Sequence, residues 1–243
     1  KALGDVQRDV RVAELRGLRA GIDTYCFLHR GKHRSAKAIL SGRPCTAFLQ
    51  PILDAISLLQ ANGAEPVLVF DGGPLPAKRR VEEDRRRCRE SARWRAEQEL
   101  RVGGEGAQLR AEQYLAGALE VTPEMAATCV RHVRALGLSV QCIVAPCEAD
   151  AQLAHLAIHG LIDVCITEDV DLLAYGCPRV LFGFSPVSGC GREIRAADLH
   201  RSRGLAPLRL SPEVLPDLAV LAGCDYLPAI PRMGLRTAAN FLH

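Results

Sequence analysis

The sequence lacks the features of several protein classes. No apolar run approaches the roughly 18 residues that a membrane-spanning helix needs, and the N-terminus has no hydrophobic region of a signal peptide. Aromatic residues make up only 5% of the chain, and no Cys-x-x-Cys pair occurs among its ten cysteines. The missing pair argues against zinc ribbons and thioredoxin chemistry. No internal repeat is present either.

The residues that are present suit a soluble globular domain. The 243 residues, of which 48% are hydrophobic, suffice for the core of one large domain. Many cysteines have apolar neighbours, as Cys165 has, and there a thiol acts as a small hydrophobe, which favours a reducing compartment, the cytosol or nucleus. Because the chain begins at Lys1 and ends inside a helical pattern, we expect it to be a fragment of a longer protein.

Apolar segments of strand type alternate with segments of helical period. The helix predicted at Pro123–Leu136 has Thr122 as its cap, Pro123 in its first turn and Gly137 at its end. Shorter helices are predicted at Ile52–Ala61 and Ala149–Ile158. Strands separated by helices indicate an α/β fold with a mostly parallel central sheet flanked by helices. The predicted strands are Leu18–Asp23, Pro66–Phe70, Ser139–Val144, Ile162–Ile166 and Val180–Phe184.

Carboxylates follow four of these strands. One such residue would be unremarkable, since Asp and Glu often cap helices there. Six of them at the carboxyl edge of one sheet would be crowded together and would repel one another unless cations lay between them. The six are Asp23, Asp71, Glu148, Asp150, Asp169 and Asp171.

A hard divalent cation fits this set of ligands. Mg²⁺ prefers oxygen ligands and takes only one or two carboxylates directly, so a surplus of acids suits two ions about 4 Å apart. Such a pair activates an attacking water and stabilises the leaving oxygen of a phosphodiester. These motifs contain no His or Cys ligand, which argues against zinc.

The segment from Lys78 to Arg101 carries ten basic and six acidic residues. Such a run is usually a solvated helix face. Lys78 and Arg85, however, are seven residues apart and share one helix face, just beyond Asp71. Cations placed there can hold a scissile phosphate and offset charge in the transition state.

Five sequence blocks, in order, resemble those of the flap endonuclease superfamily of 5′ structure-specific nucleases. The resemblance covers essentially the whole chain and within the superfamily is greatest to exonuclease 1, because of the Thr-Tyr-Cys-Phe-Leu-His run and the Glu-Ala-Asp spacing at 148–150. The blocks are Ile22-Asp-Thr-Tyr-Cys-Phe-Leu-His29, Val69-Phe-Asp-Gly72, Ala145-Pro-Cys-Glu-Ala-Asp-Ala-Gln-Leu153, Ile166-Thr-Glu-Asp-Val-Asp-Leu-Leu-Ala174 and Gly223-Cys-Asp-Tyr-Leu227.

The resemblance implies a single nuclease domain over 1–243, of the PIN-like type. It divides into an N-terminal-like region at 1–100, a helical arch at about 76–120 and an internal-like region at 120–243. The family's N-terminal Met-Gly-Ile-x-Gly-Leu block and its C-terminal helices are missing. The implied activity is 5′→3′ exonuclease and 5′-flap cleavage by two Mg²⁺ ions. Mn²⁺ is expected to replace Mg²⁺ in this activity.

The resemblance also assigns roles to single residues. It adds Asp225 to the six metal-site acids, with Asp71 and Asp169 also counted as catalytic. Lys78 and Arg85 match the arch cations that contact the scissile phosphate, and Arg79 and Arg86 lie beside them. His29 matches a side chain that stacks on a base, although a histidine at a helix end can equally pack on its neighbours. Tyr25 fits either a core position or a DNA contact.

The segment Pro228–Ala239 resembles the family's helix–two-turn–helix, which grips duplex phosphates. Arg232, Gly234 and Arg236 are the predicted DNA contacts there. The motif also holds a monovalent cation, K⁺, partly through carbonyl groups. The sequence departs from the family's pattern at three positions of this region, where the family often has Ser, Ser and Ile: Ala222, Ala229 and Met233.

The implied partners are double-stranded DNA with 5′ ends, nicks, gaps or flaps, and repair or replication proteins that bind a missing C-terminal region; no membrane is implied. The implied location is the nucleus, in DNA repair or recombination. Three alternatives remain: a flap endonuclease or junction resolvase of the same superfamily, a DNA-binding homologue with weak catalysis, and a small RNA-directed nuclease. The third fits the acids but not the helix–two-turn–helix.

Overall fold

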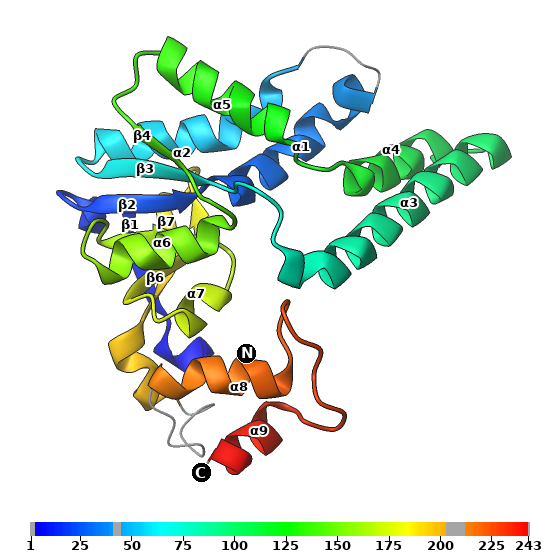
Figure 1. Cartoon of the computed structure of the whole chain (residues 1–243). Coiled ribbons are helices and arrows are strands. Elements are labelled where there is room, and N and C mark those ends of the chain that lie inside the picture. Colours follow the sequence, from blue (N-terminus) through cyan, green and yellow to red (C-terminus); the bar gives the residue numbers. More distant parts are fainter. Residues whose placement is uncertain (1–2, 41–44, 203–211, 243) are drawn as a thin grey trace. The chain divides into compact units, whose positions relative to one another are not determined.

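The computed structural model describes residues 3–40, 45–202 and 212–242 (Figure 1). The chain divides into two compact units. The sheet unit comprises residues 1–24, 55–77 and 139–243, and the arch unit comprises residues 25–54 and 78–138. No helix among the described residues has the length and apolar character that a membrane crossing requires.

The sheet unit is built on seven strands in the order β1-β7-β6-β5-β2-β3-β4. The five from β6 to β4 run parallel to one another, whereas β7 is antiparallel to β6 and β1. The predicted mostly parallel sheet is confirmed. The strands are β1 (Arg8–Arg11), β2 (Arg19–Asp23), β3 (Glu65–Phe70), β4 (Gln141–Val144), β5 (Val164–Ile166), β6 (Arg179–Ser185) and β7 (Cys190–Arg195).

Alternation along β3 shows how the sheet is buried. Val67 and Val69 belong to a core cluster with Leu153 of α6, while Leu68 and Phe70 are buried on the opposite face. Burial of both faces is the usual state of a parallel sheet. The helices of this unit are α6 (Ala149–Ile158), α7 (Asp171–Ala174), α8 (Leu215–Ala222), α9 (Leu235–Leu242) and most of α2 (Gln50–Ala61). Short 3-10 helices are η1 (Gly4–Val6), η2 (Val12–Leu15), η5 (Ala196–Arg201) and η7 (Pro212–Val214).

The strands β1 and β7, which were not predicted, surround a buried carboxylate. Glu193 accepts hydrogen bonds from Arg8 at 3.4 Å, from Arg195 at 2.8 Å and from Arg179. Burial alone would raise the pKa of the Glu193 carboxyl, but the bonds and charges of Arg195 and Arg179 outweigh burial and lower it. The ion cluster therefore joins three strands at this side of the sheet.

The arch unit is helical. Its helices are α1 (Thr24–Leu40), α3 (Arg79–Val102), α4 (Ala107–Ala118) and α5 (Pro123–Ala135), with 3-10 helices η3 (Ala47–Leu49) and η4 (Pro76–Lys78) at its borders. The predicted cap of α5 is confirmed, because Thr122 Oγ1 accepts a hydrogen bond from Met125 N at 3.3 Å. Figure 1 shows α3 and α4 side by side as a helical hairpin. Gly103, Gly104 and Gly106 lie between them with positive φ and form the turn of the hairpin.

Candidate functional site

All seven predicted metal-site acids lie in the sheet unit. Four neighbouring parallel strands, in the order β5-β2-β3-β4, end at the same edge of the sheet, and six of the acids occur at or just after these ends. Asp23 is buried at the end of β2, and the other six acids are half-buried. The sequence pattern thus predicted the edge at which these side chains lie.

Thr167 links two of the acids. Its hydroxyl donates a hydrogen bond to Asp23 Oδ2 at 3.1 Å and accepts one from the backbone N–H of Asp169 at 3.1 Å. Asp169 Oδ1 in turn accepts from the backbone N–H of Asp171 at 2.9 Å. This chain of bonds orients the carboxylates that follow β2 and β5. Sequence reasoning did not single out Thr167, although it lies inside one of the quoted blocks.

Asp71 belongs to a second group of carboxylates, which lies at the start of α6. Its Oδ1 accepts a hydrogen bond from Ala149 N at 2.8 Å. Glu148 is the N-cap residue of α6 and Asp150 is in its first turn. Three carboxylates therefore gather at one helix N-terminus, where backbone N–H groups and the helix dipole favour negative charge.

The turn after β3 depends on a glycine. A side chain at Gly72 would place its Cβ 1.8 Å from the carbonyl oxygen of Ala145, and Gly72 N donates to Cys147 O at 2.6 Å. The backbone after Asp71 can approach the backbone before Glu148 this closely only without a side chain. Close approach of these two segments is what brings Asp71 to the start of α6.

Asp225 belongs to the segment after α8, and its neighbour Tyr226 joins that segment to the acids. The Tyr226 hydroxyl donates to Glu148 Oε2 and lies within hydrogen-bonding distance of the Tyr175 hydroxyl. Burial, together with hydrogen bonds to Glu148 and Tyr175, raises the pKa of Tyr226, so its hydroxyl stays protonated and remains a donor. Sequence reasoning had no signal for this contact, which spans 78 residues of sequence.

The seven acids do not form a closed cage. In the part of the chain that the structure describes, no three His, Cys, Asp or Glu side chains are grouped closely enough to hold a metal ion. What the fold provides is a set of carboxylates at one edge, several of them oriented by hydrogen bonds.

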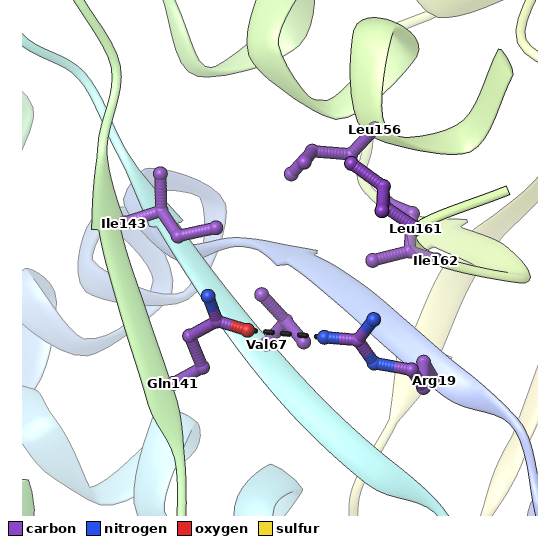
Figure 2. A pocket seen from close by; sticks show the side chains of 7 residues that line it. All are labelled: Arg19, Val67, Gln141, Ile143, Leu156, Leu161 and Ile162. Carbon is purple, nitrogen blue, oxygen red and sulfur yellow. Dashed lines mark hydrogen bonds between the residues drawn. The ribbon is translucent and has the colours of Figure 1, made fainter. Parts of the chain in front are cut away.

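A small cavity of about 90 Å³ lies at the opposite edge of the sheet (Figure 2). Arg19 and Gln141 begin their strands there and share a hydrogen bond of 3.0 Å, and the remaining lining is apolar, including Leu156 and Ile162. A space with one guanidinium, one amide and no carboxylate lacks the ligands for divalent-cation chemistry. The carboxyl edge is therefore the better candidate for catalysis.

After α8 the chain makes two turns and then enters α9, which is the arrangement of the predicted helix–two-turn–helix. Cys224 and Leu227 exchange backbone hydrogen bonds in the first turn, and Met233 N donates to Ile230 O at 2.9 Å in the second, before α9 begins at Leu235. Three exposed residues were the predicted DNA contacts: Arg232, Gly234 and Arg236. Among the described residues Arg232 is the single non-glycine with positive φ, at 65°, a conformation that costs roughly 1–2 kcal/mol.

The other predicted contacts lie in the arch unit. Lys78 is buried in η4, directly before α3, rather than projecting from the helix face with Arg85. The side chain of Arg85 is 54% exposed and pairs with Glu82 at 2.8 Å. Arg79 and Arg86 are exposed and pair with Glu83 at 3.1 Å and Glu90 at 3.7 Å.

The two candidates for DNA contact on α1, His29 and Tyr25, are in the first turns of this helix. His29 is exposed, whereas Tyr25 is half-buried. The roles predicted for these two residues, base stacking or local packing for His29 and a core or DNA contact for Tyr25, stay predictions.

The sequence matches two family models, the XPG N-terminal domain over residues 1–92 and the XPG I-region over residues 139–225. It is 36% identical over 238 residues to exonuclease 1 of Danio rerio, covering 98% of this chain and 29% of that protein. It is 35% identical over 240 residues to exodeoxyribonuclease 1 of Schizosaccharomyces pombe, covering 99% of this chain and 41% of that one. The chain thus spans about a third of the length of such relatives.

Solved structures share the fold. The catalytic core of Rad2 in complex with DNA substrate matches with a TM-score of 0.67 and 24% identity, over 98% of this chain and 65% of that chain. Flap endonuclease-1 from Methanococcus jannaschii matches with a TM-score of 0.63 and 23% identity, over 99% and 76%. The two family models follow one another along the sequence and together match most of it, and they place the chain in the flap endonuclease superfamily, with sequence similarity to exonuclease 1.

Proposed function

We propose that this chain is the nuclease part of a Mg²⁺-dependent 5′→3′ double-stranded DNA exonuclease that also cleaves 5′ flaps. The observation that carries the proposal is the delivery of six carboxylates to one edge of the sheet by four neighbouring strands. The names of the relatives, exonuclease 1 and exodeoxyribonuclease 1, support this activity.

The carboxylates fit magnesium by their chemistry. Every ligand in the set is a carboxylate oxygen, the donor type that a hard divalent cation prefers, and Mn²⁺ accepts the same donors. Like charges at one edge repel one another, and cations between them would relieve that repulsion. The residues proposed to hold two ions, directly or through water, are Asp23, Asp71, Glu148, Asp150, Asp169, Asp171 and Asp225.

Two such ions, when bound, activate a water for attack on phosphorus and stabilise the leaving oxygen. The protein's own part is orientation. Thr167 holds Asp23 and the backbone of Asp169 in one arrangement, and Ala149 N holds Asp71. Fixed partners of this kind keep ligating carboxylates in their productive rotamers before substrate arrives.

The arch unit supplies the proposed cations. Lys78 and Arg85 would hold the scissile phosphate and offset its charge in the transition state, and Arg79 and Arg86 would bind neighbouring phosphates. His29, exposed on α1, would stack on a base beside the cut, with Tyr25 in a supporting contact. These roles follow from motif position, with Lys78 seven residues beyond Asp71.

Duplex binding is assigned to the segment between α8 and α9. Arg232 and Arg236 would contact phosphates, and the exposed backbone at Gly234 would donate an N–H to one. Carbonyl groups of the two turns are the donors proposed for K⁺. The substrates would be duplexes with 5′ ends, nicks, gaps or flaps, and the setting DNA repair in the nucleus, with repair or replication proteins bound through regions outside this chain.

End-labelled duplexes with recessed 5′ ends, incubated beside 5′-flap substrates in Mg²⁺ and in EDTA, test the proposal. We expect Mg²⁺-dependent release of nucleotides from the recessed 5′ ends and incision at the flap junction. Flap incision without 5′→3′ degradation would favour a flap endonuclease instead. Binding without cleavage of either substrate would identify a DNA-binding homologue.

A further inference from the structure

Trp94 is an exposed aromatic residue with no role in the site described above. It is the one tryptophan of the chain, and 61% of its surface is accessible on α3. The buried Ala96 and the half-buried Ala92 lie on the side of α3 that packs against α4. At 3.6 residues per turn, Trp94 points roughly 160° away from Ala96, so its ring faces outward from the helical hairpin.

Arginines neighbour Trp94 along α3. Arg93 and Arg95 flank it in sequence, and Arg101 lies seven residues further along the same face. The described ion pairs of α3 engage Arg79, Arg85, Arg86, Arg87 and Arg89. None of the ion pairs found within residues 3–40, 45–202 and 212–242 involves Arg93, Arg95 or Arg101. The arginines that neighbour Trp94 in sequence thus lie outside the described ion pairs of α3.

The residues one turn away from Trp94 are two carboxylates, Glu90 and Glu97, and two neutral polar residues, Ser91 and Gln98; Glu90 pairs with Arg86 at 3.7 Å. A tryptophan that anchors a protein–protein contact usually sits in an apolar patch depleted of charge. An aromatic ring interleaved with arginines is instead the arrangement that binds single-stranded nucleic acid, where bases stack on the ring and cations hold the phosphates. The composition of this face therefore favours a nucleic-acid strand over a protein.

We propose that Trp94 stacks on a base of single-stranded DNA, with Arg93, Arg95 and Arg101 holding the adjacent phosphates. The inference rests on the proposed function, which supplies single strands as 5′ flaps. Along α3 the ring lies about 14 Å beyond Arg85 and on the other side of the helix. It is thus a second contact, separate from the phosphate site assigned to Lys78 and Arg85, and it selects substrates with a 5′ single strand.

Because Trp94 is the single tryptophan, its fluorescence reports the contact directly. Oligo(dT) is titrated into the 243-residue chain in EDTA, while the anisotropy of a labelled oligo(dT) measures binding independently. Stacking should quench the emission along the same saturation curve as the anisotropy. An unchanged emission at oligonucleotide concentrations that saturate the anisotropy would overturn the proposal and leave the ring for a protein partner.

Variants test the consequence for cleavage. Trp94→Ala should raise KM for a 5′-flap substrate at least about fivefold, with Trp94→Phe intermediate, and should leave digestion from a recessed 5′ end unchanged. Leu109→Ala is the matched control, because Leu109 on α4 is also 61% exposed. This variant should leave the cleavage of both substrates unchanged. Equal losses on both substrates in Trp94→Ala would overturn the proposal, and a thermal melt identifies a folding defect.

Failure of the proposed function has a different signature. If oligo(dT) in EDTA quenches the Trp94 emission of the unaltered chain, but the chain cleaves no substrate in Mg²⁺, the stacking site stands and the nuclease proposal falls. If the chain cleaves both substrates and its emission is unchanged at saturating oligo(dT), the nuclease proposal stands and the stacking site falls.

Discussion

The hydroxyl of Thr167 donates a hydrogen bond to the carboxylate of Asp23 at 3.1 Å, across 144 residues of sequence. The same oxygen accepts from Asp169 N, so one threonine positions groups at the ends of both β2 and β5. This pairing makes the proposed ligand geometry depend on a residue that carries no charge.

Thr167→Val keeps the shape of the side chain and removes the hydroxyl. We expect the single-turnover rate to fall about tenfold and the Mg²⁺ concentration for half-maximal rate to rise, because Asp23 and Asp169 lose their common partner. Loss of the buried bonds should cost about 1–3 kcal/mol of unfolding free energy, measured in urea. Thr128→Val on α5, where the hydroxyl bonds to Glu124 O and to the Arg131 guanidinium, is the control. An unchanged Mg²⁺ requirement in Thr167→Val would contradict the positioning role.

Asp169→Ala should abolish cleavage and leave DNA binding near normal, since it removes a metal ligand rather than a phosphate contact. Loss of a negative charge near the DNA can even tighten binding. Glu168→Ala removes the adjacent carboxylate, which is exposed and bonds to Gly183 N, and should retain activity. Cleavage by the Asp169 variant at saturating Mg²⁺ would remove this residue from the proposed ligands.

Gly72→Ala should disrupt the site, because its Cβ would meet the Ala145 carbonyl oxygen at 1.8 Å. The strained turn would shift Asp71 away from the start of α6 and lower cleavage by on the order of 10²-fold. The control is the next residue. Gly73→Ala places its Cβ at an ordinary 3.5 Å from Pro146 O and should be tolerated. Similar rates and melting temperatures for the two variants would contradict this account of the turn.

Substitutions in the arch unit separate catalysis from bulk charge. Arg85→Ala should lower the single-turnover rate on bound DNA about 10²-fold, with a smaller effect on affinity. Arg95→Ala should instead weaken binding and reduce its salt dependence. Lys78 is buried, so Lys78→Met, which keeps the apolar stem, is a better test there than alanine. If Arg85→Ala and Arg95→Ala change only affinity, and by similar amounts, the catalytic role of Arg85 fails.

Glu193→Gln tests the ion cluster of the sheet. The folded-state pKa of Glu193 is lowered, so its contribution to stability is fully present above the unfolded value of 4.5 and is lost as pH falls through the folded pKa. At neutral pH the variant should lose about 2–3 kcal/mol, since water partly screens the half-exposed arginines. The two proteins should converge as pH falls from 4.5 through the folded pKa, and parallel pH curves in thermal melts would contradict this.

The sequence allowed the carboxyl edge to be predicted because four largely apolar strands each have an acid at their end or within the next few residues. The strands β1 and β7 were missed because their sequences, Arg-Asp-Val-Arg and Cys-Gly-Arg-Glu-Ile-Arg, are as charged as a typical loop. Only the fold shows that Glu193 is buried and paired with arginines from neighbouring strands. Burial of Lys78 was missed for a related reason, since an isolated lysine gives no sign of what covers it. Tyr226 and Thr167 act through contacts far apart in sequence, which local patterns do not encode.

The order of strands in the sheet also has a consequence during synthesis. The second strand to be made, β2, lies between β3 and β5, and β1 pairs with β7, near residue 190. A ribosome adds roughly 5–20 residues per second, so about 10–40 s separate the emergence of Asp23 from that of Asp225. During that interval the nascent chain lacks a full set of carboxylates. Under the proposed mechanism, cleavage therefore requires that Asp225, and with it nearly all of these 243 residues, has emerged from the ribosome.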